Sequence, residues 1–315
     1  MKVVEYLEKS STTTFSYEII PPLRGGTAQK IFNLVEVLMP FDPPFIDVTS
    51  RAAEVYYEDS YHSTQIRRVR RKRPGTLGLC AAIKNRFNVE TVPHLLCHGF
   101  TKEETEDALI ELNYLGINNV LAVTGDDTER EKNRYEKRNK NKFANELVEQ
   151  IVALNSGLYL ENLEDSYPTD FCIGVGGYPE LHEDSPDFET DTHYLAQKVN
   201  AGADYIVTQM FFDNSNFIHF VERVRKAGID IPIIPGLKIL SSKSHLKLLP
   251  ERFHVTIPDD LVSQVKNSDP KDVKSIGVKW ALNQCQELLE MKVPCIHFYI
   301  MQSAKSVLKV VSEFK

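Results

Sequence analysis

The chain alternates between strand-like and helix-like segments from one end to the other, and this alternation limits the fold more than any other feature of its 315 residues. Eight short apolar runs rich in β-branched residues are bounded by proline, glycine or polar residues. The candidate strands are residues 15–20, 45–49, 76–83, 119–124, 171–175, 205–209, 231–235 and 295–300. Strands separated by helices are typical of a parallel sheet.

The clearest helix covers residues 101–115, where Thr101 and Glu104 form a capping box and Gly116 follows the end. Residues 91–96 and 253–257 are two further extended pieces that the eight strands leave over. No composition shift marks a linker, so we predict an α/β fold, a single (β/α)8 TIM barrel over residues 1–315. The alternative is an open doubly wound sheet, but its usual glycine-rich turn after the first strand is replaced here by Pro21 and Pro22.

Composition excludes several classes of protein. The formal net charge is −7, whereas a dedicated nucleic-acid binder is expected to be basic over at least one domain. No apolar run approaches the roughly 20 residues of a membrane span, and the N-terminus lacks the apolar core of a signal peptide. We therefore expect a cytoplasmic protein without nucleic-acid or membrane partners. We also expect a homo-oligomer, which composition does not decide. The five cysteines form no CxxC pair and are expected to be buried free thiols.

Glu18 lies in the first apolar run, just before the two prolines that end it. A run without clean alternation suggests a strand buried on both faces, which would place this carboxyl in an apolar wall. Desolvation raises the pKa of such a group and can keep it protonated near neutral pH, as a general acid requires. The alternative is a strand-end glutamate that faces solvent or pairs with an arginine such as Arg24.

In a barrel the chemistry gathers where the strands end and in the loops that follow. The polar residues at these positions are Glu18, Thr49, Asp126, Tyr178, Gln209 and Tyr299, with His94 and His182 on adjoining loops. His94 and His98 do not share a helix face because the residues around them are β-like, so no metal site is predicted. Residues 67–73 and 129–142 are charged runs that favour solvated surface. The alternative for either run is contact with a phosphorylated cofactor or a polyanionic substrate tail.

Seven motifs besides the first strand give the chain a resemblance to the methylenetetrahydrofolate reductases over nearly its whole length. The first strand reads Ser16-Tyr17-Glu18-Ile19-Ile20-Pro21-Pro22. It is followed by Pro93-His94-Leu95, Gly125-Asp126, Gly177-Tyr178-Pro179-Glu180-Leu181-His182, Lys198-Val199-Asn200-Ala201-Gly202-Ala203, Thr208-Gln209-Met210-Phe211-Phe212-Asp213, Ile234-Pro235-Gly236 and His297-Phe298-Tyr299. The chain resembles the bacterial-type catalytic barrel of that family, which implies one catalytic domain and no C-terminal regulatory domain.

The resemblance implies FAD-dependent reduction of 5,10-methylenetetrahydrofolate to 5-methyltetrahydrofolate by NADH or NADPH, with ping-pong hydride transfer through the flavin. It implies that Glu18 is the general acid, that Asp126 tunes the flavin and contacts the pterin, and that Gln209 and Tyr299 contact the folate. The flavin-contacting positions that it implies are Thr49, His94, Gly125, Asp126, Gly177, Tyr178, His182, Asp191 and Lys198, with Phe143 and Ala144 against the adenosine half.

The chain departs from the family pattern at one presumed rim of the barrel. Ser50 and Thr124 stand where the family has tyrosine and arginine, and Ser303 stands where it has a second arginine. No aromatic residue occurs near Lys243, where one is expected to stack on the nicotinamide or folate. Two alternatives therefore stay open: a flavin- or folate-binding relative with weak or regulatory function, and a metal-assisted barrel hydrolase.

Overall fold

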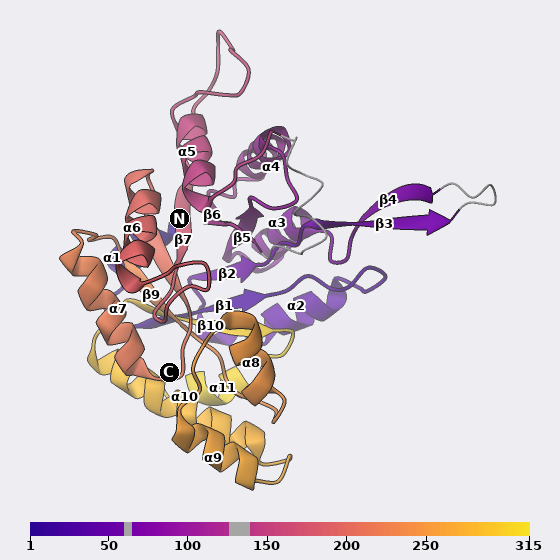
Figure 1. Cartoon of the computed structure of the whole chain (residues 1–315). Coiled ribbons are helices and arrows are strands. Elements are labelled where there is room, and N and C mark those ends of the chain that lie inside the picture. The colour runs from indigo at the N-terminus through magenta and orange to yellow at the C-terminus, as the bar shows by residue number, and fades with distance from the viewer. Residues whose placement is uncertain (60–64, 126–138) are drawn as a thin grey trace.

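The computed structural model describes residues 1–59, 65–125 and 139–315, in which eight parallel strands close into a barrel (Figure 1). The order around the barrel is β1-β10-β9-β8-β7-β6-β5-β2, so that β1 closes the sheet between β10 and β2. The barrel strands are β1 (Thr14–Ile19), β2 (Phe45–Val48), β5 (Glu90–Leu96), β6 (Asn119–Val123), β7 (Cys172–Gly177), β8 (Tyr205–Met210), β9 (Ile233–Leu237) and β10 (Cys295–Met301). The predicted (β/α)8 fold is confirmed.

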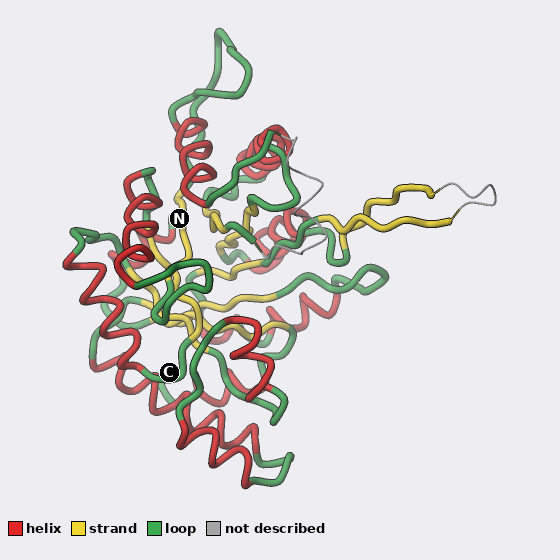
Figure 2. Tube along the Cα trace, in the orientation of Figure 1, coloured by secondary structure: helices red, strands yellow, loops and turns green. Residues whose placement is uncertain are grey.

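Helices surround the barrel and alternate with its strands (Figures 1 and 2). They are α1 (Val3–Lys9), α2 (Gln29–Glu36), the 3-10 helix η1 (Met39–Phe41), α3 (Thr76–Phe87), α4 (Lys102–Tyr114), α5 (Ala144–Asn155), α6 (Phe188–Asn200), α7 (Asn214–Lys226), α8 (His245–Phe253), α9 (Asp259–Asn267), α10 (Val273–Glu290) and α11 (Lys305–Val311). No helix among the described residues is both long and apolar enough to cross a membrane.

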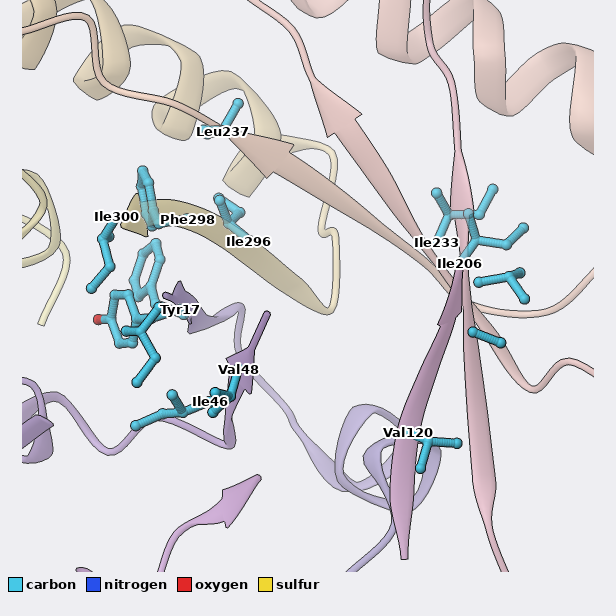
Figure 3. Packing of buried hydrophobic residues seen from close by; sticks show 14 of the residues in the cluster. Tyr17, Ile46, Val48, Val120, Ile206, Ile233, Leu237, Ile296, Phe298 and Ile300 are labelled. Atoms are coloured by element: carbon cyan, nitrogen blue, oxygen red, sulfur yellow. The ribbon is translucent and has the colours of Figure 1, made fainter. Parts of the chain in front are cut away.

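Apolar residues of the barrel strands belong to two clusters, one on each face of the sheet. Tyr17, Ile46 and Phe298 belong to the large cluster that packs between the strands and the helices (Figure 3). Phe45, Tyr205 and their neighbours form a smaller cluster drawn from seven strands. Because successive side chains of a strand point to opposite faces, the smaller cluster fills the inside of the barrel.

Helix α1 closes the end of the barrel at which the strands begin. Val3 and Leu7 join the inner cluster, and the Val3 amide donates to Asn119 Oδ1 at 2.8 Å. The Asn119 amide group in turn donates to the Met1 carbonyl oxygen at 3.1 Å. With this end covered by a helix, the opposite end, where the strands finish, is the place for a site.

Residues 76–83 form a helix rather than a strand, so the third strand prediction is wrong. The structure places them in α3, where Leu79, Cys80 and Ile83 are buried on one helix face. A short apolar run without charges does not reveal its period, and here it starts a helix after Gly75. The barrel strand at this point is β5, which contains the leftover residues 91–96.

The other extended piece, residues 253–257, forms no strand. Phe253 ends α8, and His254 adopts a left-handed backbone with φ of 52° that turns the chain. Val255 and Ile257 are buried in a third cluster with residues of α8, α9 and α10, so packing rather than pairing explains their apolar character. The predicted helix at residues 101–115 is confirmed as α4, with the Thr101 capping box in place.

The arginine run is part of a two-stranded antiparallel hairpin that projects from the barrel (Figures 1 and 2). Its strands are β3 (Ala53–Asp59) and β4 (Gln65–Arg71). Arg73, just beyond the hairpin, donates to the Pro21 carbonyl oxygen at 2.5 Å and so ties its base to the end of the first strand. Of the second charged run, residues 129–138 lie outside the described residues.

Helix α10 packs so closely on the chain after β9 that only glycine fits at position 277. A Cβ atom there would lie 1.9 Å from the Leu240 carbonyl oxygen, which is backbone and cannot move aside alone. We expect Gly277→Ala to lower the free energy of unfolding by roughly 1–3 kcal/mol in urea denaturation. Gly78→Ala in α3 is the matched control: its Cβ meets nothing within 4 Å, so it should be neutral or stabilise by up to about 1 kcal/mol. Equal effects of the two changes would contradict this packing.

Candidate active site

The inner face of the barrel changes from apolar to polar toward the ends of the strands. Asp47 lies two residues after the inner-cluster residue Phe45, and His94 lies two after Val92. The same alternation brings Glu18, Lys238, His297 and Tyr299 to the inner face. Charged and hydrogen-bonding groups therefore gather inside the barrel, above an apolar floor.

His297 lies between the inner apolar cluster and the polar groups at the strand ends. Its Nδ1 lies 2.8 Å from Ser16 Oγ on the neighbouring strand, and its side chain is buried. Burial lowers the pKa of His297 to about 4, although the charge of Asp47 opposes this shift. The ring is therefore neutral at neutral pH and serves as a hydrogen-bonded part of the wall.

Glu18, Asp47 and His94 form the central cluster. His94 Nε2 lies 3.3 Å from Asp47 Oδ2 and 3.7 Å from Glu18 Oε2. The side chain of Glu18 is 12% exposed, that of Asp47 is 1% exposed and that of His94 is 9% exposed. The alternative pairing of Glu18 with Arg24 is not found, since the exposed Arg24 donates to the Arg71 carbonyl oxygen.

Burial raises the pKa of Glu18 to about 7. The positive charges of His94 and Lys238 oppose this shift, and the negative charge of Asp47 adds to it. Burial alone would lower the pKa of His94, but its hydrogen bond to Asp47 and the charge of Glu18 raise it. Glu18 is thus a carboxyl group that can hold or release a proton near neutral pH.

The neighbouring wall of the site is built on β8, β9 and β10. The Tyr299 hydroxyl donates to the Thr208 carbonyl oxygen at 2.5 Å, and the Gly236 amide donates to Thr208 Oγ1 at 2.9 Å. A Cβ atom at Gly236 would lie 2.3 Å from the Thr208 carbonyl oxygen and 2.6 Å from the Tyr299 ring. The Tyr299 ring therefore fills the space that a side chain at position 236 would take, and its position is fixed.

A second cluster surrounds the end of β7. Lys198 Nζ donates to the Gly176 carbonyl oxygen at 2.6 Å, and burial lowers its pKa to about 8, although Asp191 opposes the shift. The Ser185 hydroxyl donates to Asp191 Oδ1 at 3.1 Å.

The rings of Tyr178 and His182 belong to the same cluster and meet edge to face, with their centroids 4.3 Å apart. In the strand order β7 is four strands from β1 in either direction, so this cluster and Glu18 face each other across the barrel.

The structure brings the predicted site residues together in these two groups. Glu18, His94 and Tyr299 line one side, and Tyr178, His182, Asp191 and Lys198 gather on the other. Thr49 follows β2 directly, and its amide donates to the Ile19 carbonyl oxygen at 3.1 Å, beside Glu18.

The remaining predicted residues contribute differently. Gln209 is half-buried, and its Oε1 accepts from the Met210 amide at 2.9 Å. Gly177 faces outward, because a Cβ there would lie 2.7 Å from both Ile206 and Phe220. Gly125 follows β6 with φ of 87°, and the predicted residue Asp126 lies outside the described residues.

Phe143 and Ala144 start helix α5. The Phe143 side chain is 61% exposed, whereas Ala144 is buried. An exposed aromatic ring at a helix start is available for contact with a ligand.

Asp47, Lys238 and His297 are polar residues of the site that the sequence analysis did not single out. Asp47 precedes Thr49 by two residues in a predicted strand, so strand alternation alone could have found it. His297 stands in one of the family motifs, but the motif alone indicates no role for it. Lys238 lies beyond the end of the predicted strand, and its inward direction needed the register of β9.

Comparison with known proteins decides the family. The family model described as methylenetetrahydrofolate reductase matches residues 2–315. The chain belongs to the methylenetetrahydrofolate reductase family. Methylenetetrahydrofolate reductase 1 of Schizosaccharomyces pombe is 31% identical over 95% of this chain and 45% of its own length. The 5,10-methylenetetrahydrofolate reductase of Salmonella typhimurium is 28% identical over 92% of this chain and 86% of its own length.

This member of the family spans about half the length of the first curated relatives it matches. Among solved structures, a Clostridium thermocellum protein described as binding two copies of 5-methyl-5,6,7,8-tetrahydrofolic acid has a TM-score of 0.57. The two chains share 13% identity over 98% of this chain and 96% of that one. At this identity the likeness shows the barrel fold alone.

The raised pKa of Glu18 predicts a specific pH dependence of stability. Between its ordinary pKa of 4.5 and about 7, the folded protein holds a proton on Glu18 that the unfolded chain has released. Stability is therefore lost as pH rises through this window, and Glu18→Gln should remove the loss. We expect the stabilisation by Glu18→Gln, measured by urea denaturation, to grow by roughly 2–3 kcal/mol from pH 5 to pH 8.

The matched control is Glu8→Gln, which changes an exposed carboxyl on α1. Its effect should not depend on pH over the same range. If Glu18→Gln behaved like Glu8→Gln, Glu18 would have an ordinary pKa and the buried cluster would not shift it.

Proposed function

We propose that this chain reduces 5,10-methylenetetrahydrofolate to 5-methyltetrahydrofolate, with FAD as cofactor and NADH or NADPH as the hydride source, in a ping-pong reaction. The observation that carries the proposal is Glu18, a carboxyl group with a pKa of about 7 inside a barrel of this family. Reduction at the methylene carbon opens the five-membered ring of the folate, and the nitrogen released needs a proton. A buried acid that titrates near neutral pH suits that step.

The residues around the end of β7 fit a flavin cofactor. Gly176 faces the inside of the barrel, and a Cβ atom there would meet nothing within 4 Å, so the inner face is open beside it. The half-buried Lys198 holds its ammonium group on the Gly176 carbonyl oxygen beside this opening, next to Tyr178, His182 and Asp191. An open inner face next to a cation and aromatic rings matches the shape and charge of a flavin with its phosphates.

In this proposal the cofactor is held by residues from several strand ends. Tyr178, His182, Asp191 and Lys198 hold it from β7 and α6, and Thr49 and His94 hold it from the Glu18 side. Gly125, Asp126, Phe143 and Ala144 contribute from other parts of the chain, whereas the outward-facing Gly177 does not. When bound, FAD would supply a carrier that accepts a hydride from the nicotinamide and passes it to the folate.

The protein's own side chains would then carry out the proton transfer. Glu18 donates its proton to the folate nitrogen as the carbon–nitrogen bond breaks, which leaves a carboxylate on Glu18. His94, 3.7 Å away and hydrogen-bonded to Asp47, stabilises that carboxylate and is held in place by Asp47. The apolar floor below His297 keeps bulk water away from the cluster, which strengthens these charge interactions. Gln209 and Tyr299 are the residues we propose for contact with the folate.

The second candidate is a relative that binds flavin or folate but turns over slowly. It is favoured by the position of Lys243, where the family resemblance leads us to expect an aromatic residue. In the structure Lys243 is exposed, and its Nζ donates to the Lys266 carbonyl oxygen at 2.9 Å. Steady turnover with NADH or NADPH and the folate would exclude this candidate.

We expect the purified protein to carry non-covalent FAD and to lose its yellow absorbance when NADH or NADPH is added without folate. Lys198→Met should weaken FAD binding by about 10- to 100-fold, since it removes a charged partner, and fluorescence titration would measure this. Lys226→Met, an exposed lysine at the end of α7, is the matched control and should bind FAD normally. A protein that stays colourless in excess FAD would contradict the proposal.

Glu18→Gln should separate the two halves of the reaction. The amide keeps the size of the side chain but cannot give up a proton, so reduction by NADH or NADPH in stopped flow should stay within a few-fold of wild type. Reoxidation by methylenetetrahydrofolate should slow by about 10²-fold or more, because only that half needs a proton. Equal loss of both halves would indicate a structural role, and loss of neither would remove Glu18 from the reaction.

A further inference from the structure

Lys238 is a half-buried cation at the end of β9, on the inner face of the barrel. It follows Ile234 and Gly236 at alternate positions, and Ile234 belongs to the inner cluster. Its Nζ donates to the Tyr299 carbonyl oxygen at 2.5 Å. Burial lowers the pKa of Lys238 to about 8, and Glu18 opposes that shift, so the side chain keeps most of its charge at neutral pH.

The register of the strands puts Lys238 at the level of Glu18. Glu18 on β1 pairs with Tyr299 on β10, and Leu237 on β9 pairs with Phe298 on β10. Glu18, Tyr299 and Lys238 are therefore neighbours on three adjacent strands. The register between β1 and β10 shifts directly after Glu18, and Met301 on β10 has a φ of 62°. Strand β10 therefore leaves regular pairing next to Tyr299, whose carbonyl group accepts the hydrogen bond from Lys238.

We infer that Lys238 is a positioning residue for Glu18: its ammonium group, fixed on the Tyr299 carbonyl oxygen, favours the carboxylate that Glu18 becomes when it gives up its proton. This inference rests on the proposed function, in which Glu18 is the proton donor. It adds a cation from β9 to a cluster otherwise built from β1, β2 and β5.

The charges around Glu18 show why such a cation matters. His94 and Lys238 favour its ionised form, while burial and Asp47 disfavour it, and the buried Tyr299 hydroxyl lies on the neighbouring strand. Lys238 itself faces Glu18 and the half-buried His245, whose pKa is lowered by burial and by the charge of Lys238. Without Lys238, Glu18 would hold its proton more tightly and would be a weaker acid toward the folate nitrogen.

The test is a direct titration of Glu18 in the free protein, without substrate. Carbon-13 NMR of protein labelled at glutamate carboxyl carbons would give the Glu18 pKa, with the resonance assigned by its loss in Glu18→Gln. Lys238→Met removes the charge, Lys238→Gln removes the charge but keeps an amide donor, and Lys238→Arg keeps the charge. Lys247→Met, an exposed lysine on α8, is the matched control.

We expect Lys238→Met and Lys238→Gln to raise the Glu18 pKa by about one unit or more, with little change in Lys238→Arg or Lys247→Met. Reoxidation by the folate should slow by about three- to tenfold in the two uncharged variants, while reduction by nicotinamide stays unchanged.

If Lys238→Met failed to fold, Lys238→Gln would still test the charge. An unchanged Glu18 pKa in a folded uncharged variant would overturn the inference, whether or not the protein reduces folate. A raised pKa in a protein that reduces no folate would support the pairing and contradict the proposed function.

Discussion

The burial of one carboxyl group inside a closed barrel is the constraint on which the rest of the site depends. A carboxylate loses its hydration when it enters such a space, so it must be protonated or faced by positive charge. Glu18 has both: its pKa is raised to about 7, and the positive charges of Lys238 and His94 favour its ionised form. These two residues come from β9 and β5, each separated from β1 by one strand. The hydrogen bond from His94 to Asp47 keeps the imidazole in place.

The closed sheet makes this arrangement possible because it brings residues from distant parts of the sequence to one level. Glu18 and Lys238 are 220 positions apart, yet only β10 lies between their strands. On the far side of the barrel, Lys198 and Asp191 form the second charged cluster beside the open inner face at Gly176. A flat ligand that crosses the mouth can therefore contact the acid at one edge and a cation at the other.

Most of the fold was predictable because each strand carries its own local signal. Short apolar runs rich in β-branched residues located seven of the eight barrel strands, and the error at α3 arose where an uncharged run hides the helical period. The buried position of Glu18 was predictable because the acid stands in an apolar strand before two prolines. Lys238 was not predictable as an inward-facing residue, since the predicted strand ended at Pro235. Pro235 in fact lies inside β9, next to an irregularity in its register with β8.

The central claim is that Glu18 delivers a proton to the folate at neutral pH. The most direct measurement is the single-turnover rate of reoxidation by methylenetetrahydrofolate across the pH range, with the protein reduced beforehand. The account predicts a rate that is constant below about pH 7 and falls about tenfold per pH unit above it, as Glu18 loses its proton. A rate that stays constant or rises through this range would contradict it.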